Sequence, residues 1–489
     1  MNEPVLRRRG VLNLLLGGSV LVAMPACATA PERSPRPALR PAAPVGGLAS
    51  GDGDLSYALI DMRTGALIAG QGEATPLPPA SVAKALTALY ALDALGAGYQ
   101  FRTRLVATGP VTDGILRGDL VPAGGGDPTL ETDDLAAMAA DLARAGVRQV
   151  TGRFLVWGGA LPFIPEIAQD QAVQAGYNPS VSGINLNFNR VHFEWRNSGG
   201  AYSVAMDARS ARHQPAVSMA HMQIVNRANP PYTYRRAGAR DEWTVARAAL
   251  GGTGSRWLPV RHPELYAGEV LRVLAQGQGI ALAAPQIATT APNGRDLVTH
   301  LSAPLQEVLR DLLRFSTNIS AEAVGMMASA ARAGQPASLR ASAAQMSDWA
   351  RARYGMSSAA LVDHSGLGAN SRVSMRDMAL MFRLAGQEGQ LRALLREHPF
   401  RDRNNTIVAQ PGVDVRAKTG TLFYVSALGG YLRGPGGREL AFSICQADLA
   451  RRAQVAGGQV DRPEGTAAWA RASRQRKQEL LLRWAREHS

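Results

Sequence analysis

Residues 79–87 read Pro-Ala-Ser-Val-Ala-Lys-Ala-Leu-Thr, and they open the stretch of chain with the clearest structural signal. From Ser81 to Leu95 the sequence contains neither Pro nor Gly and is rich in Ala, Leu and Thr, which predicts a largely buried helix. Ser81 and Lys84 stand three residues apart, so a helix would bring the hydroxyl and the amine together on one face. The two residues are therefore a candidate nucleophile and base.

The chemistry of this pair follows from its position at the start of a helix. A serine hydroxyl is a weak nucleophile until a base takes its proton, and a crowded, partly buried lysine can have its pKa lowered enough to serve. The helix N-terminus also directs backbone N–H groups towards the place where an oxyanion would form. The spacing Ser-x-x-Lys by itself is common on solvated helix turns, so it needs support from other motifs.

Two further motifs follow later in the chain. The triplet Ser-Thr-Asn at 316–318 comes directly after a helical stretch, where its hydroxyl can relay a proton and its amide can hold a peptide bond. The quartet Lys-Thr-Gly-Thr at 418–421 lies in a strand-like run, where the cation and hydroxyl can bind a carboxylate. Alone, the triplet is ordinary loop sequence, and the quartet would more often be an exposed edge strand.

The three motifs together are much more specific than any one of them. The chain has only three lysines, Lys84, Lys418 and Lys477, and two of them fall inside the motifs. The order Ser-x-x-Lys, Ser-x-Asn and Lys-Thr-Gly is the motif set of serine β-lactamases and penicillin-binding proteins. We therefore expect a serine enzyme of this class.

The long interval between the first two motifs resembles one branch of that class. Ser81 and Ser316 are farther apart than in compact β-lactamases, as in the class C low-molecular-mass penicillin-binding proteins of the penicillin-binding protein 4 type, which are D-alanyl-D-alanine carboxypeptidases/endopeptidases. Residues 124–130 (Gly-Gly-Gly-Asp-Pro-Thr-Leu) and 363–367 (Asp-His-Ser-Gly-Leu) resemble further segments of that family. The resemblance spans roughly residues 55–431. Two positions depart from the family pattern, Thr317 and His364.

The resemblance implies an α/β fold, a penicillin-binding/serine β-lactamase-like transpeptidase domain interrupted by a large β-rich insertion. It also implies roles for the first two motifs. Lys84 would take the proton of Ser81, which attacks the carbonyl carbon of the penultimate D-Ala. Ser316, held near Lys84 and Asn318, would pass a proton to the departing amine.

The third motif would bind the substrate and complete the oxyanion hole. Lys418 and Thr419 would hold the terminal carboxylate, and Gly420 would let the substrate backbone lie close. The backbone N–H groups of Ser81 and Thr421 would stabilise the oxyanion. The implied partners are peptidoglycan peptides, with β-lactams as covalent inhibitors.

Other functions remain open on the sequence. A β-lactamase or esterase on the same scaffold is the alternative, and a catalytically silent wall-binding protein would suit the basic charge. The bond that is cut, in a carboxypeptidase or an endopeptidase reaction, is not decided. The eight histidines include no His-Glu-x-x-His motif, so we expect no zinc and no cofactor.

The ends of the chain indicate an exported protein of several parts. Arg7 to Arg9 precede a short apolar run at 11–24 and small residues around 26–30, the pattern of an export signal over 1–27 that resembles a twin-arginine signal. A Pro/Ala-rich linker is expected over 28–48. The peptidase domain would comprise 49–100 and 296–489, with the inserted β-rich module, in one or two subdomains, over 101–295.

Composition and charge limit the classes of partner that we expect. The chain has 489 residues and a net charge of +14, but no basic stripe interleaved with aromatics, which argues against nucleic acid. We expect a periplasmic protein that would meet a membrane only through a lipid on Cys27, and whether Cys27 is lipidated is left open. Cys445 is the only other cysteine. If Cys27 is removed with the signal or carries a lipid, Cys445 has no partner within the chain and we expect no disulfide bond.

Overall fold

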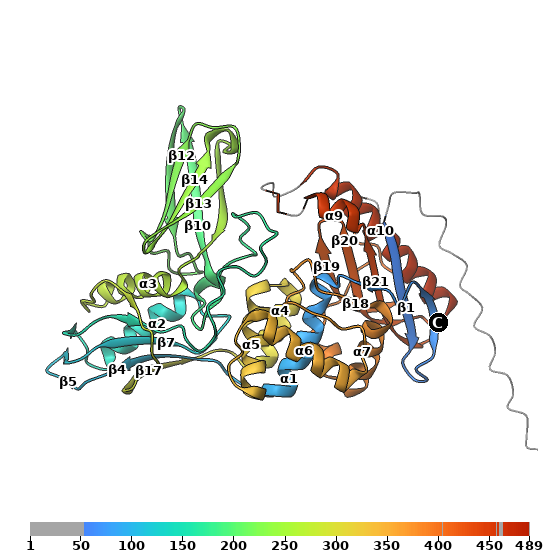
Figure 1. Ribbon diagram of the computed structural model, residues 1–489, viewed down its shortest axis with the longest axis horizontal. Coiled ribbons are helices and arrows are strands. Elements are labelled where there is room, and N and C mark those ends of the chain that lie inside the picture. The colour runs from blue at the N-terminus through green and yellow to red at the C-terminus, as the bar shows by residue number, and fades with distance from the viewer. Residues whose placement is uncertain (1–52, 403, 456, 459–462, 489) are drawn as a thin grey trace, which may run out of the picture. The chain divides into compact units, whose positions relative to one another are not determined.

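The computed structural model describes residues 53–402, 404–455, 457–458 and 463–488 (Figure 1). The predicted export signal, the linker and Cys27 lie outside these residues. Within the described part of the chain, no helix is both long and apolar enough to cross a membrane. Among the described residues, Cys445 is buried and forms no disulfide bond.

A five-stranded antiparallel sheet joins opposite ends of the chain. Its order is β19–β20–β21–β1–β2. The strands are β1 (Asp54–Asp61), β2 (Leu67–Gln71), β19 (Asp414–Leu422), β20 (Val425–Arg433) and β21 (Glu439–Ala447). β1 pairs with β21 along its whole length, from Asp54 opposite Ala447 to Asp61 opposite Leu440. The N-terminal and C-terminal strands therefore form one sheet.

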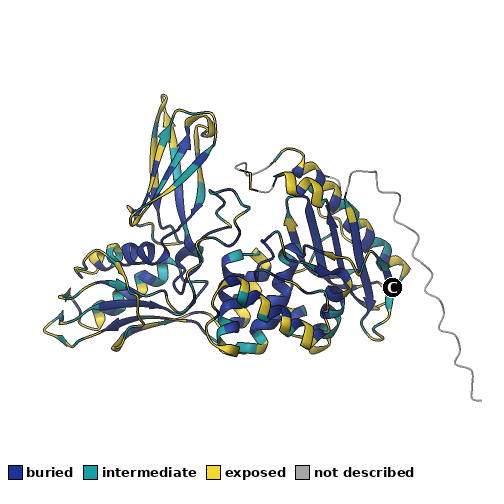
Figure 2. Cartoon of the chain, in the orientation of Figure 1, coloured by how far each residue is buried: buried dark blue, intermediate teal, exposed yellow. Residues whose placement is uncertain are grey.

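Helices cover both faces of this sheet, and its central strands are largely buried (Figure 2). Successive side chains of these strands contribute to two different cores. One core combines the sheet with a group of helices whose bounds are α1 (Ala83–Leu95), α4 (Leu305–Phe315), α5 (Asn318–Ala333), α6 (Leu339–Tyr354), α7 (Met375–Glu388) and α8 (Gln390–Leu394). On the other face, α10 (Thr466–Glu487) packs Leu480, Leu481 and Trp484 against Tyr57 and Phe442. The result is a helix–sheet–helix sandwich.

The helices predicted from the sequence lie where they were expected. The helix predicted from Ser81 becomes a short 3-10 turn, η1 (Ala80–Val82), that continues as α1. The helical stretch predicted directly before the Ser-Thr-Asn triplet is α4. The predicted fold class is confirmed.

The chain between α1 and α4 forms a separate hydrophobic core that includes Leu105, Phe154, Trp243 and Val298. Two helices and several small sheets surround it, and these include sheets with the orders β17–β4–β7, β11–β10–β15 and β12–β14–β13. The bounds are β4 (Arg102–Ala107), β7 (Leu120–Gly124), α2 (Thr132–Arg144), β10 (Arg190–Ser198), β11 (Ala201–Asp207), β12 (Ala220–Val225), β13 (Tyr232–Ala237), β14 (Arg240–Ala246), β15 (Thr253–Pro259), α3 (Pro263–Gly277) and β17 (Arg295–Leu301). β17 lies across the expected boundary at residue 296 and pairs with β4.

The remaining elements are short. They are β3 (Pro76–Leu77), β5 (Val111–Thr112), β6 (Ile115–Leu116), β8 (Gln149–Val150), β9 (Leu155–Val156), η2 (Leu186–Asn189), η3 (Arg247–Ala249), β16 (Gln286–Ile287), β18 (Val373–Ser374) and α9 (Leu449–Val455).

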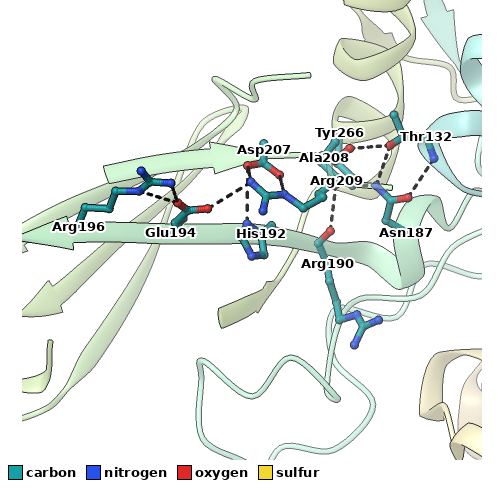
Figure 3. A network of polar contacts seen from close by, with 10 residues as sticks. All are labelled: Thr132, Asn187, Arg190, His192, Glu194, Arg196, Asp207, Ala208, Arg209 and Tyr266. Carbon is teal, nitrogen blue, oxygen red and sulfur yellow. Dashed lines mark hydrogen bonds and ion pairs between the residues drawn. The ribbon is translucent and has the colours of Figure 1, made fainter. Parts of the chain in front are cut away.

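Polar contacts tie the β10–β11 ribbon to its neighbours (Figure 3). Arg209 bridges Asp207, at 2.9 Å, and Glu194, at 3.3 Å, across the two strands. Farther along, the Asn187 side chain donates to Thr132 Oγ1 at 2.8 Å, which joins η2 to α2. In these contacts, charged side chains from the chain between α1 and α4 pair with one another.

Removing the Trp484 ring tests the packing of α10. Trp484 is fully buried and lies 5.4 Å from the Tyr57 ring centroid, so Trp484→Ala should lower the free energy of unfolding by about 3–5 kcal/mol. Urea unfolding followed by far-UV circular dichroism measures the change. Arg486→Ala, an exposed position on the same helix, should stay within about 0.5 kcal/mol of the unsubstituted protein. Equal effects at both positions would contradict the packing.

Candidate active site

Ser81 lies at the turn where β3 leads into α1. The preceding residue, Ala80, has a left-handed backbone conformation with φ of +46°, which is unusual for a residue with a Cβ and costs about 1–3 kcal/mol. Such strained turns cluster at functional sites, where the surrounding structure holds them in place. Here the turn leaves Ser81 partly exposed while Lys84, one helical turn later, is completely buried.

Lys84 connects three separate parts of the chain. Its Nζ lies 2.9 Å from Ser81 Oγ, 2.7 Å from Asn318 Oδ1 and 2.9 Å from the backbone oxygen of Ser365. Three N–H groups of an ammonium would satisfy all three oxygens. In the neutral amine, two N–H groups still reach Asn318 and Ser365, and the lone pair faces the Ser81 hydroxyl.

Ser316 and Lys418, from the second and third motifs, also meet at this site. Ser316 ends α4 in a left-handed conformation with φ of +61°, and Thr317 is the N-cap of α5. Ser316 Oγ accepts a hydrogen bond from Lys418 Nζ at 2.9 Å. Lys418 is buried on β19, and burial together with the nearby Lys84 holds its pKa well below the usual range. The structure thus brings two lysines and two serines of the predicted site together.

β19 approaches the Ser81 turn closely because residue 420 is a glycine. A Cβ at Gly420 would lie 2.9 Å from the Ser81 backbone nitrogen and 2.9 Å from Ala80 Cβ. A larger residue would therefore push the strand away from the turn. A cleft of about 450 Å³ opens beside the strand, and Ser81, Ser316, Asn318 and Thr421 line it.

Two buried carboxylates behind Lys84 were missed in the sequence. Glu322, one helical turn after Asn318 on α5, accepts hydrogen bonds from the backbone N–H groups of His364 and Ser365 at 2.8 and 2.9 Å. Asp363 accepts hydrogen bonds from the N–H groups of Gly366 and Gly368. Together they hold the loop whose Ser365 carbonyl binds Lys84. The signal for Glu322 was its i, i+4 spacing from Asn318.

The electrostatics of this cluster set the basicity of Lys84. Burial lowers the pKa of Lys84 to about 8, and the negative charges of Glu322 and Asp363 oppose that shift. Burial likewise raises the pKa of Glu322 to about 8, with Asp363 adding to the effect, while burial raises the pKa of Asp363. A lysine with a pKa near 8 has a substantial neutral fraction at neutral pH, as a general base needs.

His364, one of the two departures from the family pattern, is accommodated in the core. Its ring is completely buried, stacks on Tyr90 and lies 2.7 Å from Ser342 Oγ through Nε2. The space exists because residue 325 is a glycine, since a Cβ there would lie 2.2 Å from the His364 ring. Burial lowers the pKa of His364 to about 3, so this ring is neutral and packs structurally.

Residues of the inserted module also line the cleft. Gln171 and Tyr177 contribute side chains, and Arg452 from α9 and Phe423 from the β19–β20 turn complete that end. These four positions had no sequence signal, because each depends on how distant segments meet. Among the described residues, no group of three or more His, Cys, Asp or Glu side chains is placed to hold a metal ion.

Comparison with known proteins identifies the family of the chain. The family model described as D-Ala-D-Ala carboxypeptidase 3 (S13) matches residues 52–461. The chain belongs to this family. It is thereby a serine-type D-Ala-D-Ala carboxypeptidase, and the family predicted from the three motifs is confirmed.

Individual relatives are similar to this chain over most of its length. A D-alanyl-D-alanine carboxypeptidase of Actinomadura sp. (strain R39) is 28% identical over 420 residues, which cover 79% of this chain and 76% of the relative. The crystal structure of penicillin binding protein 4 from Haemophilus influenzae matches with a TM-score of 0.71 and 21% identity, covering 88% of this chain and 97% of that one. The same Haemophilus protein complexed with a β-lactam matches with a TM-score of 0.69 and 20% identity, and also covers 88% and 97% of the two chains.

The lowered pKa of Lys84 predicts how acylation depends on pH. If Lys84 acts as the neutral base, its active fraction grows as pH rises, by about tenfold per pH unit below its pKa and levelling off above it. With a pKa of about 8, the rate of acylation by a fluorescent penicillin should rise between pH 6 and 8 and flatten near pH 9. A rate that is flat over this range would contradict the role of Lys84, provided that melting curves show the protein folded throughout.

Proposed function

We propose that this peptidase cleaves the D-Ala-D-Ala bond, and the D-Ala-meso-diaminopimelate bond of cross-links, in peptidoglycan peptides through an acyl-enzyme on Ser81. The observation that carries the proposal is the 2.9 Å contact between Lys84 Nζ and Ser81 Oγ, in a cleft that Ser316 and Asn318 also line. The arrangement brings together a nucleophile, a base of lowered pKa and a second lysine, Lys418, whose Nζ can donate to a carboxylate.

The acylation step uses Lys84 as the base. Lys84 takes the proton of Ser81, the Ser81 oxygen bonds to the carbonyl carbon of the penultimate D-Ala, and the C–N bond to the next residue breaks. The leaving amine receives a proton through Ser316. Asn318 supports this step by holding Lys84 through its Oδ1 and presenting its amide to the substrate.

Substrate binding and the oxyanion hole use β19. Lys418 and Thr419 hold the carboxylate of the terminal residue or its counterpart in a cross-link. The backbone N–H groups of Ser81 and Thr421 stabilise the oxyanion, and the close approach at Gly420 supports this pairing. Water then hydrolyses the ester and releases Ser81.

Penicillin binding and location follow from the same proposal. β-Lactams resemble the scissile peptide, and a Haemophilus protein of the same fold has been solved with one bound, so we expect a lasting acyl group on Ser81. The enzyme acts in the periplasm after export, with residues 1–27 as the signal. The peptidase domain comprises two chain segments around an inserted module that ends after β17.

Mass spectrometry tests the nucleophile. Incubation with penicillin should add the mass of one penicillin to the protein, while Ser81→Ala should show no adduct because the attacking oxygen is gone. Ser320→Ala serves as the control, because this buried hydroxyl on α5 lies near the site and should leave the adduct intact. An adduct of undiminished yield on Ser81→Ala would overturn the assignment.

Digestion of purified muropeptides tests the substrate. Monomeric pentapeptides should lose D-Ala and cross-linked dimers should yield monomers, each followed by mass analysis of the products. Absence of both products, with rapid turnover of nitrocefin, would favour the alternative of a β-lactamase or esterase on the same scaffold. Binding to sacculi without product or acylation would instead indicate a wall-binding protein.

A further inference from the structure

One segment of the inserted module, Asp170–Tyr177, reaches the active-site cleft. It follows a stretch in which Ile167 and Ala168 pack against Ile319 and Ala323 of α5, the helix that begins at Asn318. Gln171 and Tyr177 then line the cleft opposite Ser81. We call residues 170–177 the cleft segment.

The C-terminal end of the cleft segment touches Asn318 directly. The backbone oxygen of Tyr177 accepts a hydrogen bond from Asn318 Nδ2 at 2.9 Å, while Asn318 Oδ1 accepts one from Lys84 at 2.7 Å. The Asn318 amide thus has an acceptor at its nitrogen and a donor at its oxygen. A flipped amide would place oxygen against oxygen at Tyr177 and N–H against N–H at Lys84, so these two contacts fix its orientation.

The N-terminal end of the cleft segment is held by Arg452. Its guanidinium lies 3.3 Å from Asp170 Oδ2 and also donates to the backbone oxygen of Phe423 at 3.3 Å, just beyond β19. Only 7% of the Arg452 side chain is exposed, so Asp170 is close to a charge that water barely reaches. The backbone N–H of Gly457 donates to the oxygen of Asp170 at 3.0 Å, which adds a second tie.

A chain of polar contacts joins the two ends. Asp170 Oδ1 accepts a hydrogen bond from Gln171 Nε2 at 3.0 Å, and Gln171 Oε1 accepts one from the Tyr177 hydroxyl at 3.0 Å. A change at Asp170 can therefore be transmitted to Tyr177, whose carbonyl faces Asn318.

The base of the segment is closed inside the inserted module. The buried Asn178 side chain binds both the N–H and the oxygen of Ala168, at 2.9 and 2.7 Å. Arg261, also buried, donates from Nη1 to the backbone oxygens of Pro165 and Asn178 at 2.8 and 2.9 Å. These contacts give the segment a fixed base, and its tip is held by the peptidase domain.

We infer that the cleft segment is a positioning element of the active site: Tyr177 orients the Asn318 amide, and the Arg452–Asp170 ion pair holds the segment in the position where it does so. Asp170 and Arg452 are then positioning residues for the acylation of Ser81. The inference rests on the proposed function, because it concerns how Lys84 and Asn318 are held for that reaction. It gives the inserted module a part in catalysis.

Penicillin acylation measured under single-turnover conditions separates binding from chemistry. Asp170→Asn keeps the size of the side chain and removes its charge, and Arg452→Gln removes the partner. Each should lower the acylation rate constant roughly tenfold, because small displacements of reacting groups are costly, and leave the initial binding constant within about twofold. The double variant should be no worse than Arg452→Gln alone, because both substitutions break the same ion pair. Asp170→Glu should recover most of the rate.

The matched control is Asp119→Asn, which breaks the Arg153–Asp119 ion pair elsewhere in the inserted module at a similarly exposed carboxylate, 19% against 21% for Asp170. It should leave the rate constant unchanged. Hydrogen exchange should show faster exchange of the amides of residues 170–177 in Arg452→Gln and not in the control. Rate constants within about twofold of the unsubstituted protein in both Asp170→Asn and Arg452→Gln would overturn the inference while leaving the proposed function intact. Failure of penicillin to acylate the unsubstituted protein at all would overturn both.

Discussion

The buried amine of Lys84 is the contact on which the active site depends. Three oxygens surround it, from Ser81, Asn318 and Ser365, and they belong to segments widely separated along the chain. An N–H group buried without an acceptor costs about 1–3 kcal/mol, so each of the three segments is favoured in the one position where it meets this nitrogen. The atom that would activate the nucleophile thus also organises the site around it.

The carboxylates behind Lys84 explain why its burial does not make it too weak a base. A lysine fully buried without negative neighbours can have a pKa as low as about 5–6, where it would be neutral at working pH but would hold a proton only weakly. Glu322 and Asp363 oppose that shift and leave the pKa at about 8, close to the range in which a general base is efficient. Backbone N–H groups of the loop 363–368 partly offset the burial of both carboxylates, which in turn keep this loop in place.

The sequence was informative where the predicted site residues lie close together on one helix or one strand. Ser81 and Lys84 share a helix, and residues 418–421 form part of one strand, so periodicity and motif order were enough to predict both. Glu322 shares a helix with Asn318 but belongs to none of the three motifs. The contacts of Tyr177, Asp170 and Arg452 had no local signature, because they form only when the inserted module meets α5 and the segment after β21. Likewise, nothing in the sequence around His364 indicated that Gly325 leaves room for its ring.

The free energies involved show which contacts order the cleft segment and which contact sets its position. Fixing the backbone of eight residues costs on the order of 10 kcal/mol, far more than the Arg452–Asp170 pair can return. The order of the segment must therefore come from its base, where Asn178 and Arg261 close the loop and Ile167 packs against α5. What remains for the ion pair is to select one position among the few that the closed loop can adopt. A contact of a few kcal/mol suffices for that selection. A small shift of the cleft segment would change the orientation of the Asn318 amide.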